Sequence, residues 1–262
     1  MARWRRALVT GASAGIGEAM AKQLAADGVD LVLVARRAER LDALAASLRS
    51  SVCRVDVLPA DLHDPVDLEK VAARVADADS PIDLLVNNAG YGVHGEFWTQ
   101  PFDAARGQVD LNVTALLRLT HCAVGRMFEE GRGAVVNISS VAGMQPGPGY
   151  AVYAATKAFV TNFTESLAEE LRGSGVSVTA VCPGLTRTEF HAVARATERT
   201  DSLPNFVWMS ADAVAQEALE AAGKGKVVHV TGVANKVLAG LSSVAPRGIR
   251  RRAAGVVTAR RR

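Results

Sequence analysis

Short runs of apolar, often β-branched residues alternate along the chain with longer segments whose apolar positions recur at helical spacing. This alternation predicts right-handed βαβ units that together build one parallel sheet. The candidate strands are residues 7–10, 30–34, 53–58, 82–86, 134–139, 176–181 and 227–230. We therefore expect a single α/β domain over residues 1–262, with a doubly wound sheet of about seven parallel strands whose ligand crevice lies beyond their carboxyl ends.

Two helices between these strands are marked by their own residues. Leu41 and Leu44 recur on one face after the second strand. Asp64 and Pro65 are typical of a helix start, because the carboxylate caps free N–H groups and proline is tolerated in the first turn. Residues 185–209 are too irregular for a plain connection, and we expect a substrate lid there.

The composition, 49% apolar and 22% charged, is that of an ordinary globular protein. No run approaches the roughly 18 apolar residues that a membrane-spanning helix needs, and no apolar segment of a signal peptide follows the N-terminal arginines. Cys53, Cys122 and Cys182 are scattered in apolar segments, which is typical of reduced thiols. These features predict a cytoplasmic protein.

The formal net charge of +3 is unevenly distributed, because seven arginines lie within residues 247–262 and the body of the chain is acidic. Before this basic tail, Val237, Leu238, Leu241 and Val244 recur at helical spacing. We interpret the end of the chain as a docked helix with a solvated tail. A peripheral contact with an anionic membrane surface and a contact between subunits stay open as alternatives.

A glycine-rich turn follows the first strand, where residues 10–17 read TGASAGIG and a helix begins. Glycines allow the backbone to turn sharply and to approach a ligand, and the N-terminus of a helix attracts an anion. The turn therefore predicts a site for the pyrophosphate of a dinucleotide, with an ordinary glycine-rich turn as the alternative. The candidate contacts are Gly11, Ser13, Ala14, Gly15, Ile16 and Gly17. The same residues spell the G-x-S-x-G of serine hydrolases, but no histidine downstream has a supporting context.

In dinucleotide-binding folds, the ribose of the cofactor is addressed by residues about 20 positions after the glycines. Here the chain reads Ala35, Arg36 and Arg37, with no carboxylate to hold a 2′-hydroxyl and two guanidinium groups that can pair with a 2′-phosphate. NADP(H) is therefore favoured over NAD(H). The alternative is that both arginines are solvated residues of the next helix.

The middle of the chain adds motifs that carry chemistry. They are NNAG at 87–90, Asn112, ISS at 138–140, YAATK at 153–157 and PGLTRT at 183–188. Together with the glycine-rich turn, and in this order over roughly residues 6–190, they make the chain resemble the short-chain dehydrogenase/reductase superfamily. The resemblance implies a Rossmann-like fold and an oxidoreductase that interconverts an alcohol and a carbonyl with a nicotinamide cofactor.

Tyr153 and Lys157 stand four residues apart in a helix predicted at 153–172, so that both side chains leave the same face. A nearby ammonium favours the phenolate, which brings the pKa of the phenol toward a useful range. Ser140 ends a buried strand, where its hydroxyl can hydrogen-bond the substrate oxygen. The serine of the family matches Ser140 better than Ser139.

The resemblance implies further roles. Asn112, in a helix predicted at 103–130, matches a water-holding residue of the family's proton relay, and Lys157 matches the residue that bonds the nicotinamide ribose. The implied catalytic set is Asn112, Ser140, Tyr153 and Lys157. The implied contacts with the rest of the cofactor are Asp61, Leu62, Asn88, Ala89, Gly90, Pro183, Gly184, Thr186 and Thr188. We expect no metal site.

Apolar and aromatic residues gather around the predicted crevice, which favours a hydrophobic ketone or alcohol over a charged sugar. They are Tyr91, Val93, Phe97, Trp98, Met144, Pro146, Tyr150, Phe190, Phe206, Trp208 and Met209. Packing beneath the lid is the alternative for each of them.

Other interpretations stay open. The chain could be a non-catalytic NADP(H) sensor, although a sensor needs no proton relay, or an NAD-preferring alcohol dehydrogenase of the same family. The acidic body disfavours nucleic acid as a partner of the arginine tail, and we expect none. Family members commonly assemble through the two helices at 103–130 and 153–172, so the resemblance implies a homodimer or homotetramer.

Overall fold

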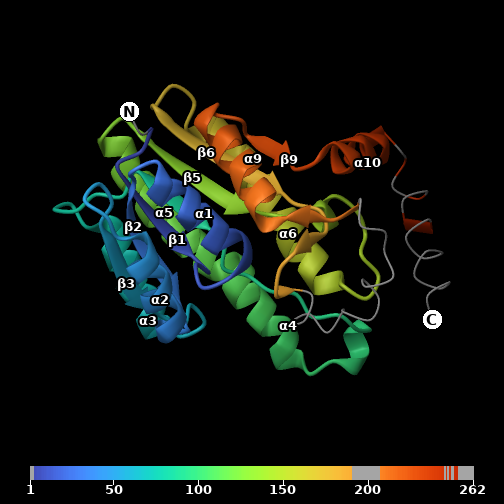
Figure 1. Cartoon of the computed structure of the whole chain (residues 1–262). Coiled ribbons are helices and arrows are strands. Elements are labelled where there is room, and N and C mark those ends of the chain that lie inside the picture. The colour runs from blue at the N-terminus through green and yellow to red at the C-terminus, as the bar shows by residue number, and fades with distance from the viewer. Residues whose placement is uncertain (1–2, 191–206, 245, 247, 249–250, 253–262) are drawn as a thin grey trace.

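The computed structural model describes residues 3–190, 207–244, 246, 248 and 251–252. A seven-stranded parallel sheet crosses the molecule in the order β3-β2-β1-β4-β5-β6-β9 (Figure 1). The predicted doubly wound sheet is therefore confirmed. The strands are β1 (Arg6–Thr10), β2 (Asp30–Ala35), β3 (Val55–Pro59), β4 (Leu84–Asn87), β5 (Gly133–Ile138), β6 (Val176–Cys182) and β9 (Val228–Val230).

One strand boundary differs from its prediction for a visible reason. The strand predicted at 53–58 begins only at Val55, because Cys53 forms an isolated antiparallel bridge with Ser50 in the preceding turn. The Cys53 side chain is nevertheless buried against the sheet, which is what its place in an apolar run indicated. Apolar pattern alone does not separate a strand from a buried turn beside it.

Helices cover both faces of the sheet and bury their apolar stripes against it (Figure 1). On one face lie α1 (Gly15–Ala26), α2 (Ala38–Leu48) and α9 (Ala211–Gly223), and on the other α3 (Pro65–Ala76), α5 (Leu116–Glu129) and α6 (Ala151–Glu170). Leu24 and Leu41 on the first face, and Leu119 and Met127 on the second, are fully buried. Each such side chain stabilises the fold by about 1.5–3 kcal/mol.

The helix predicted at 103–130 is composite. It begins as α4 (Phe102–Val109), passes through a π-helical turn at Asp110–Ala115 and continues as α5. A π-helical turn carries one extra residue in a helical turn, is rare, and is found frequently at functional sites. Here it contains Asn112, which was singled out from the sequence.

Two short parallel strands, β7 (Thr186–Arg187) and β8 (Met209–Ser210), pair with each other, so the two ends of the predicted lid lie side by side. The lid itself falls mostly on residues 191–206, and most of the predicted tail on residues 253–262, which lie outside the described residues together with Phe206.

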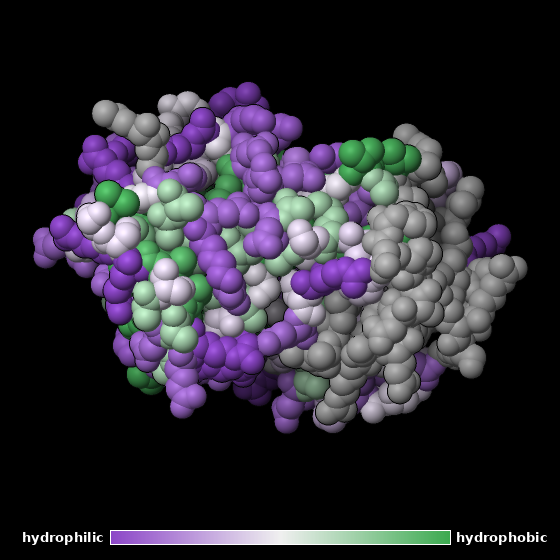
Figure 2. Space-filling view, in the orientation of Figure 1, coloured by the Kyte–Doolittle hydropathy of each residue, from purple (hydrophilic) through white to green (hydrophobic). Residues whose placement is uncertain are grey.

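The helix α10 (Val233–Val244) lies beyond the edge strand β9. Val233 is 76% and Val237 is 56% exposed. Figure 2 shows apolar atoms at the surface where α10 lies. Within the described part of the chain, no helix is both long and apolar enough to cross a membrane.

A buried chain of hydrogen bonds ties β4 and β5 to the helices on one face. The Asn87 side-chain amide donates to the hydroxyl of Thr120 and to the side-chain oxygen Oδ1 of Asn137, both over 2.9 Å. Asn137 in turn donates to the hydroxyl of Thr164 over 3.0 Å. Because all four side chains are buried, each bond removed leaves a polar group without water to replace its partner.

The substitution Asn137→Ala is expected to lower the free energy of unfolding by about 1–3 kcal/mol, since the buried Asn87 amide and Thr164 hydroxyl each lose one hydrogen bond that water cannot replace. Urea denaturation followed by far-UV circular dichroism measures this loss. The control is Asn162→Ala, at an exposed position of α6, which should change the free energy of unfolding by no more than about 0.5 kcal/mol. Equal stability of the Asn137 variant and the wild type would contradict the buried network.

Candidate functional site

A cavity of about 850 Å³ opens at the carboxyl ends of the sheet strands, where β1 separates the connections that turn to either face. Most residues that the sequence singled out for cofactor and catalysis line it. They are Gly11, Ser13, Ala14, Gly15, Ile16, Arg36, Arg37, Asp61, Leu62, Asn88, Ala89, Gly90, Ser140, Tyr153, Lys157, Pro183, Gly184, Thr186 and Thr188. Gly17 and Asn112 do not line it and support residues that do.

The glycine-rich turn has the geometry that an anion site requires. Gly11 and Gly15 adopt φ of +64° and +60°, which side chains with a Cβ rarely adopt. Helix α1 begins at Gly15, and its N-cap residue Ala14 supplies no side-chain hydrogen bond to the first N–H groups. These N–H groups and the positive end of the helix dipole therefore suit a phosphate.

This turn is joined to the end of β4 by a set of hydrogen bonds. The hydroxyl of Thr10 donates to the Val86 carbonyl and accepts from the backbone N–H groups of Asn88 and Ala89. The Asn88 side-chain amide donates to the carbonyls of Thr10 and Gly11 over 2.9 and 3.2 Å. The NNAG motif thus holds the glycine-rich turn as well as lining the cavity.

The two predicted 2′-phosphate residues lie at one end of the cavity. The Arg37 guanidinium donates to the Ser13 hydroxyl over 3.1 and 3.2 Å and to the Glu189 carboxylate over 2.9 Å. Arg36 lies 3.9 Å from a carboxylate oxygen of Asp61. The Arg37 guanidinium and the Ser13 hydroxyl meet, and such a pair of donors fits a phosphate group.

Asp61 is held in its charged form. Burial alone would raise its pKa, but hydrogen bonds from the backbone and ring of His63, and then the charge of Arg36, lower the pKa of the Asp61 carboxyl below its usual value. The ring nitrogen Nδ1 of His63 lies 3.0 Å from that carboxylate. His63 also lines the cavity, although its sequence context drew no attention to it.

Ser140, Tyr153 and Lys157 meet at the other end of the cavity. Burial raises the pKa of Tyr153 to about 12, and the hydrogen bond with Ser140 opposes this rise only in part. Burial also lowers the pKa of Lys157 to about 8, and the Lys157 ammonium donates to the Ile138 carbonyl over 2.7 Å. Its Nζ lies 5.9 Å from the centroid of the Tyr153 ring.

The site does not show the expected lowering of the Tyr153 pKa by the lysine. Loss of water around a buried phenol penalises the phenolate, and an ammonium nearly 6 Å from the ring does not offset this. Tyr153 is consequently a protonated phenol at neutral pH. A protonated phenol is suited to donate a proton to a carbonyl oxygen as that oxygen gains charge.

Two neighbouring polar residues support this end of the cavity. Ser139 directs its hydroxyl to the Lys157 carbonyl over 2.7 Å, which fastens α6 to the sheet. Asn112 is buried, and its amide binds both the N–H and the carbonyl of Tyr91 and the Thr156 hydroxyl. The Asn112 side chain therefore positions the loop after NNAG and the start of α6.

The substrate end of the cavity is more restricted than the sequence suggested. Of the predicted apolar residues, only Tyr91, Tyr150 and Phe190 line it within the described residues, and Trp98 is 77% exposed outside it. The others that lie elsewhere are Val93, Phe97, Met144, Pro146, Trp208 and Met209.

His94, Pro148 and Glu189 line the cavity and were missed by sequence reasoning. The ring of His94 meets the edge of Tyr150 at a centroid distance of 4.9 Å. The only available signal was the position of His94 in the loop after NNAG and of Glu189 in the segment after PGLTRT.

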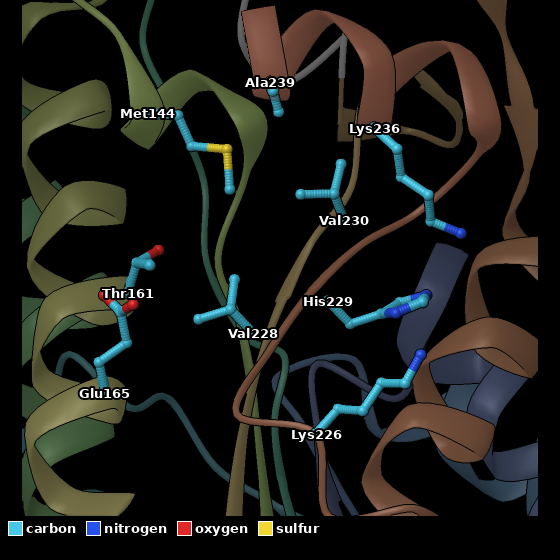
Figure 3. Close-up of a pocket in the computed structure, with 10 residues that line it drawn as sticks. Met144, Thr161, Glu165, Lys226, Val228, His229, Val230, Lys236 and Ala239 are labelled. Atoms are coloured by element: carbon cyan, nitrogen blue, oxygen red, sulfur yellow. The ribbon is translucent and has the colours of Figure 1, made fainter. Parts of the chain in front are cut away.

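A second cavity, of about 500 Å³, lies between α6, β9 and α10 (Figure 3). Val228 points across it toward Thr161 of α6 and Val230 toward Met144, whereas His229 points to the opposite side of the strand. His229 and Lys236, which also border it, both bind Glu217. This cavity brings together no motif of the sequence analysis, so we take the larger one as the functional site.

The comparisons with known proteins agree with this geometry. The short chain dehydrogenase family matches residues 5–199, and the chain belongs to this family. Sulfoacetaldehyde reductase 2 of Chromohalobacter salexigens is 41% identical over 189 residues, which are 71% of this chain and 74% of that protein. The chain is therefore an oxidoreductase of a family that acts on alcohol and carbonyl groups.

Solved structures extend the similarity to nearly the whole chain. A short-chain dehydrogenase from Sphingobium yanoikuyae in complex with NADPH has a TM-score of 0.82 and 39% identity, covering 92% of this chain and 96% of its own. The bulky-bulky ketone specific alcohol dehydrogenase from Comamonas testosteroni has a TM-score of 0.78 and 35% identity, covering 93% and 95%.

The substitution Gly17→Ala is expected to destabilise the protein by about 1–3 kcal/mol and to weaken dinucleotide binding, because its Cβ would lie 2.4 Å from the Asn88 amide nitrogen and 2.5 Å from the Gly11 carbonyl. Gly125→Ala in α5 is the matched control. A Cβ there meets nothing within 4 Å, so alanine should stabilise by about 0.5–1 kcal/mol. Urea denaturation compares the two variants. A Gly17 variant as stable as the Gly125 variant would contradict the close packing of Gly17 against Asn88 and Gly11.

Proposed function

We propose that this protein is an NADP(H)-dependent oxidoreductase that interconverts a hydrophobic ketone and a secondary alcohol, with Tyr153 as general acid and base. The observation that carries the proposal is the placement of Tyr153. It lies buried at the cavity wall beside Ser140 and Lys157, at the opposite end of one continuous cavity from Arg36 and Arg37.

The residues of the cavity fit a dinucleotide. The N-terminus of α1, which no side chain caps, would hold the pyrophosphate, and Asp61 would lie beside the adenine. Arg36, Arg37 and the Ser13 hydroxyl would hold a 2′-phosphate. The absence of a carboxylate at the end of β2, and the NADPH bound by the Sphingobium yanoikuyae relative, support NADP(H) over NAD(H).

In the proposed reaction, the bound cofactor supplies or accepts a hydride at its nicotinamide ring. The Ser140 hydroxyl donates a hydrogen bond to the substrate oxygen and holds it next to Tyr153. Tyr153, protonated at neutral pH, donates its proton as the oxygen gains negative charge. Lys157 keeps a positive charge close to the phenol and would bind the ribose of the cofactor. In the reverse direction Tyr153 would have to act as the phenolate to accept the proton of the alcohol.

The surroundings of Tyr153 support a hydrophobic substrate. Its ring contacts Tyr150 and Phe190, with ring centroids at 6.1 and 5.4 Å. Among the described lining residues, Arg36 and Arg37 lie toward the cofactor end, and Lys157 is the basic residue close to Tyr153. A sulfonate or carboxylate of the substrate would therefore meet few cations there. The similarity to a bulky-bulky ketone specific enzyme supports the same substrate class.

We also propose a cytoplasmic homodimer or homotetramer that assembles through α4, α5 and α6. Exposed apolar side chains on these helices, including Phe102, Val109 and Phe159, support an assembly surface there. The docked helix, the subunit contact and the peripheral membrane contact remain the alternatives for the C-terminal segment.

The substitution Tyr153→Phe is expected to reduce kcat for ketone reduction by about 100- to 10,000-fold, because it removes the proton donor and little else. The affinity for NADPH, measured by fluorescence titration, should stay within about threefold. Turnover of a panel of hydrophobic ketones is followed by NADPH absorbance. A variant that keeps wild-type turnover would contradict the role of Tyr153. Tight NADPH binding without turnover by the wild type would favour the sensor.

The substitution Arg37→Met is expected to weaken NADPH binding by about 10- to 100-fold and NADH binding by less than about threefold, since only NADPH carries the 2′-phosphate. Fluorescence titration of both cofactors at constant ionic strength measures the effect. A wild type that prefers NADH, or a variant that weakens both cofactors equally, would contradict the proposed cofactor preference.

A further inference from the structure

The segment that follows β7 crosses the mouth of the cavity. At one side Thr188 packs over Gly15, where an added Cβ would lie 3.0 Å from the threonine methyl group. At the other side the ring of Phe190 lies 5.4 Å from that of Tyr153, centroid to centroid. Glu189 lies between them and reaches the end of the cavity where the arginines gather.

The Glu189 carboxylate binds two guanidinium groups at once. Its Oε1 accepts from Arg40 over 2.6 Å and its Oε2 accepts from Arg37 over 2.9 Å. Hydrogen bonds from Arg40 and then Arg37 lower the pKa of Glu189, so the carboxylate is charged at neutral pH. Arg37 also donates to the Ser13 hydroxyl, which places Glu189 beside the group that would receive a 2′-phosphate.

We propose that Glu189 is a specificity-determining residue that competes with the cofactor's 2′-phosphate for Arg37 and Arg40. This inference rests on the proposed NADP(H) preference. A carboxylate and a phosphate oxygen seek the same N–H donors, so the phosphate must displace Glu189 from Arg37 or lie next to a second anion. NADH has only a 2′-hydroxyl there and leaves the ion pairs of Glu189 in place. Glu189 therefore opposes NADPH selectively.

The strength of these ion pairs suits an exchange. The side chains of Glu189, Arg37 and Arg40 are 49%, 43% and 51% exposed, so water screens both pairs. Ion pairs of this exposure shift an equilibrium by only about two- to fivefold each. A doubly charged phosphate can displace them, and their loss should still be measurable as a change in affinity.

The test compares the wild type with Glu189→Gln, which keeps the shape of the side chain and removes its charge. Dissociation constants for NADPH and NADH are measured by fluorescence titration of the intact protein. Adenosine 2′,5′-bisphosphate and adenosine 5′-monophosphate are titrated by calorimetry, which isolates the 2′-phosphate without any turnover. We expect Glu189→Gln to bind NADPH and the bisphosphate about 3- to 10-fold more tightly, with NADH and the monophosphate within twofold.

Two further variants separate the contact from a general change in charge. Glu39→Gln removes an exposed carboxylate from the first turn of α2, the helix that also carries Arg40, and should leave all four affinities within twofold. Glu189→Asp keeps the charge but shortens its reach, and should fall between the wild type and Glu189→Gln.

The inference is overturned if Glu189→Gln leaves the NADPH affinity unchanged or weakens it, if NADH gains equally, or if Glu39→Gln has the same effect. The proposed cofactor preference is judged separately, from the wild type alone. A wild type that prefers NADPH together with an inert Glu189→Gln would overturn the competition and leave that preference standing.

Discussion

The hydrogen bonds between Thr10 and the loop after β4 are the constraint on which the rest of the site depends. One hydroxyl bonds three backbone groups of the neighbouring strand end, and the Asn88 amide returns two bonds to the glycine-rich turn. The turn therefore cannot drift from β4, and the first N–H groups of α1 are held toward the cavity. The same closeness leaves no room for a Cβ at Gly11 or Gly17. A preorganised turn of this kind binds an anion without first having to order its own backbone.

Burial is what sets the chemistry at the other end of the cavity. Removal of water raises the pKa of Tyr153 and lowers that of Lys157, because burial favours the neutral phenol and the neutral amine over their charged forms. The phenol keeps its proton at neutral pH and the lysine still carries its charge for the most part. This pairing suits reduction, in which the enzyme must deliver a proton to oxygen. Phe190 contacts Tyr153, and its neighbour Glu189 binds Arg37. The same short segment therefore contacts both the catalytic end and the cofactor end of the cavity.

The sequence predicts those parts of the molecule that depend on local pattern. The strands and the helix starts follow from periodicity and capping. Most of the residues that meet in the cavity belong to short motifs of the sequence, at strand ends or, for Tyr153 and Lys157, in α6. The π-helical turn around Asn112 cannot be predicted from the spacing of apolar residues, because one extra residue does not visibly interrupt the helical pattern. Glu189 and His94 reach the cavity through tertiary packing, and exposed Trp98 lies outside it for the same reason. The pKa of Tyr153 was predicted with the wrong sign, since spacing reveals the nearby ammonium but not the depth of burial.

The central claim is that this site transfers a hydride directly from NADPH to a carbonyl carbon. The most direct test uses NADPH with deuterium at both C4 positions of the reduced nicotinamide, together with a panel of hydrophobic ketones in ordinary water. Mass spectrometry and proton NMR then locate the label in the alcohol product. The account predicts one deuterium on the carbinol carbon and none elsewhere. A product whose carbinol carbon carries hydrogen from water, or a panel of ketones left unreduced while NADPH is bound, would contradict it.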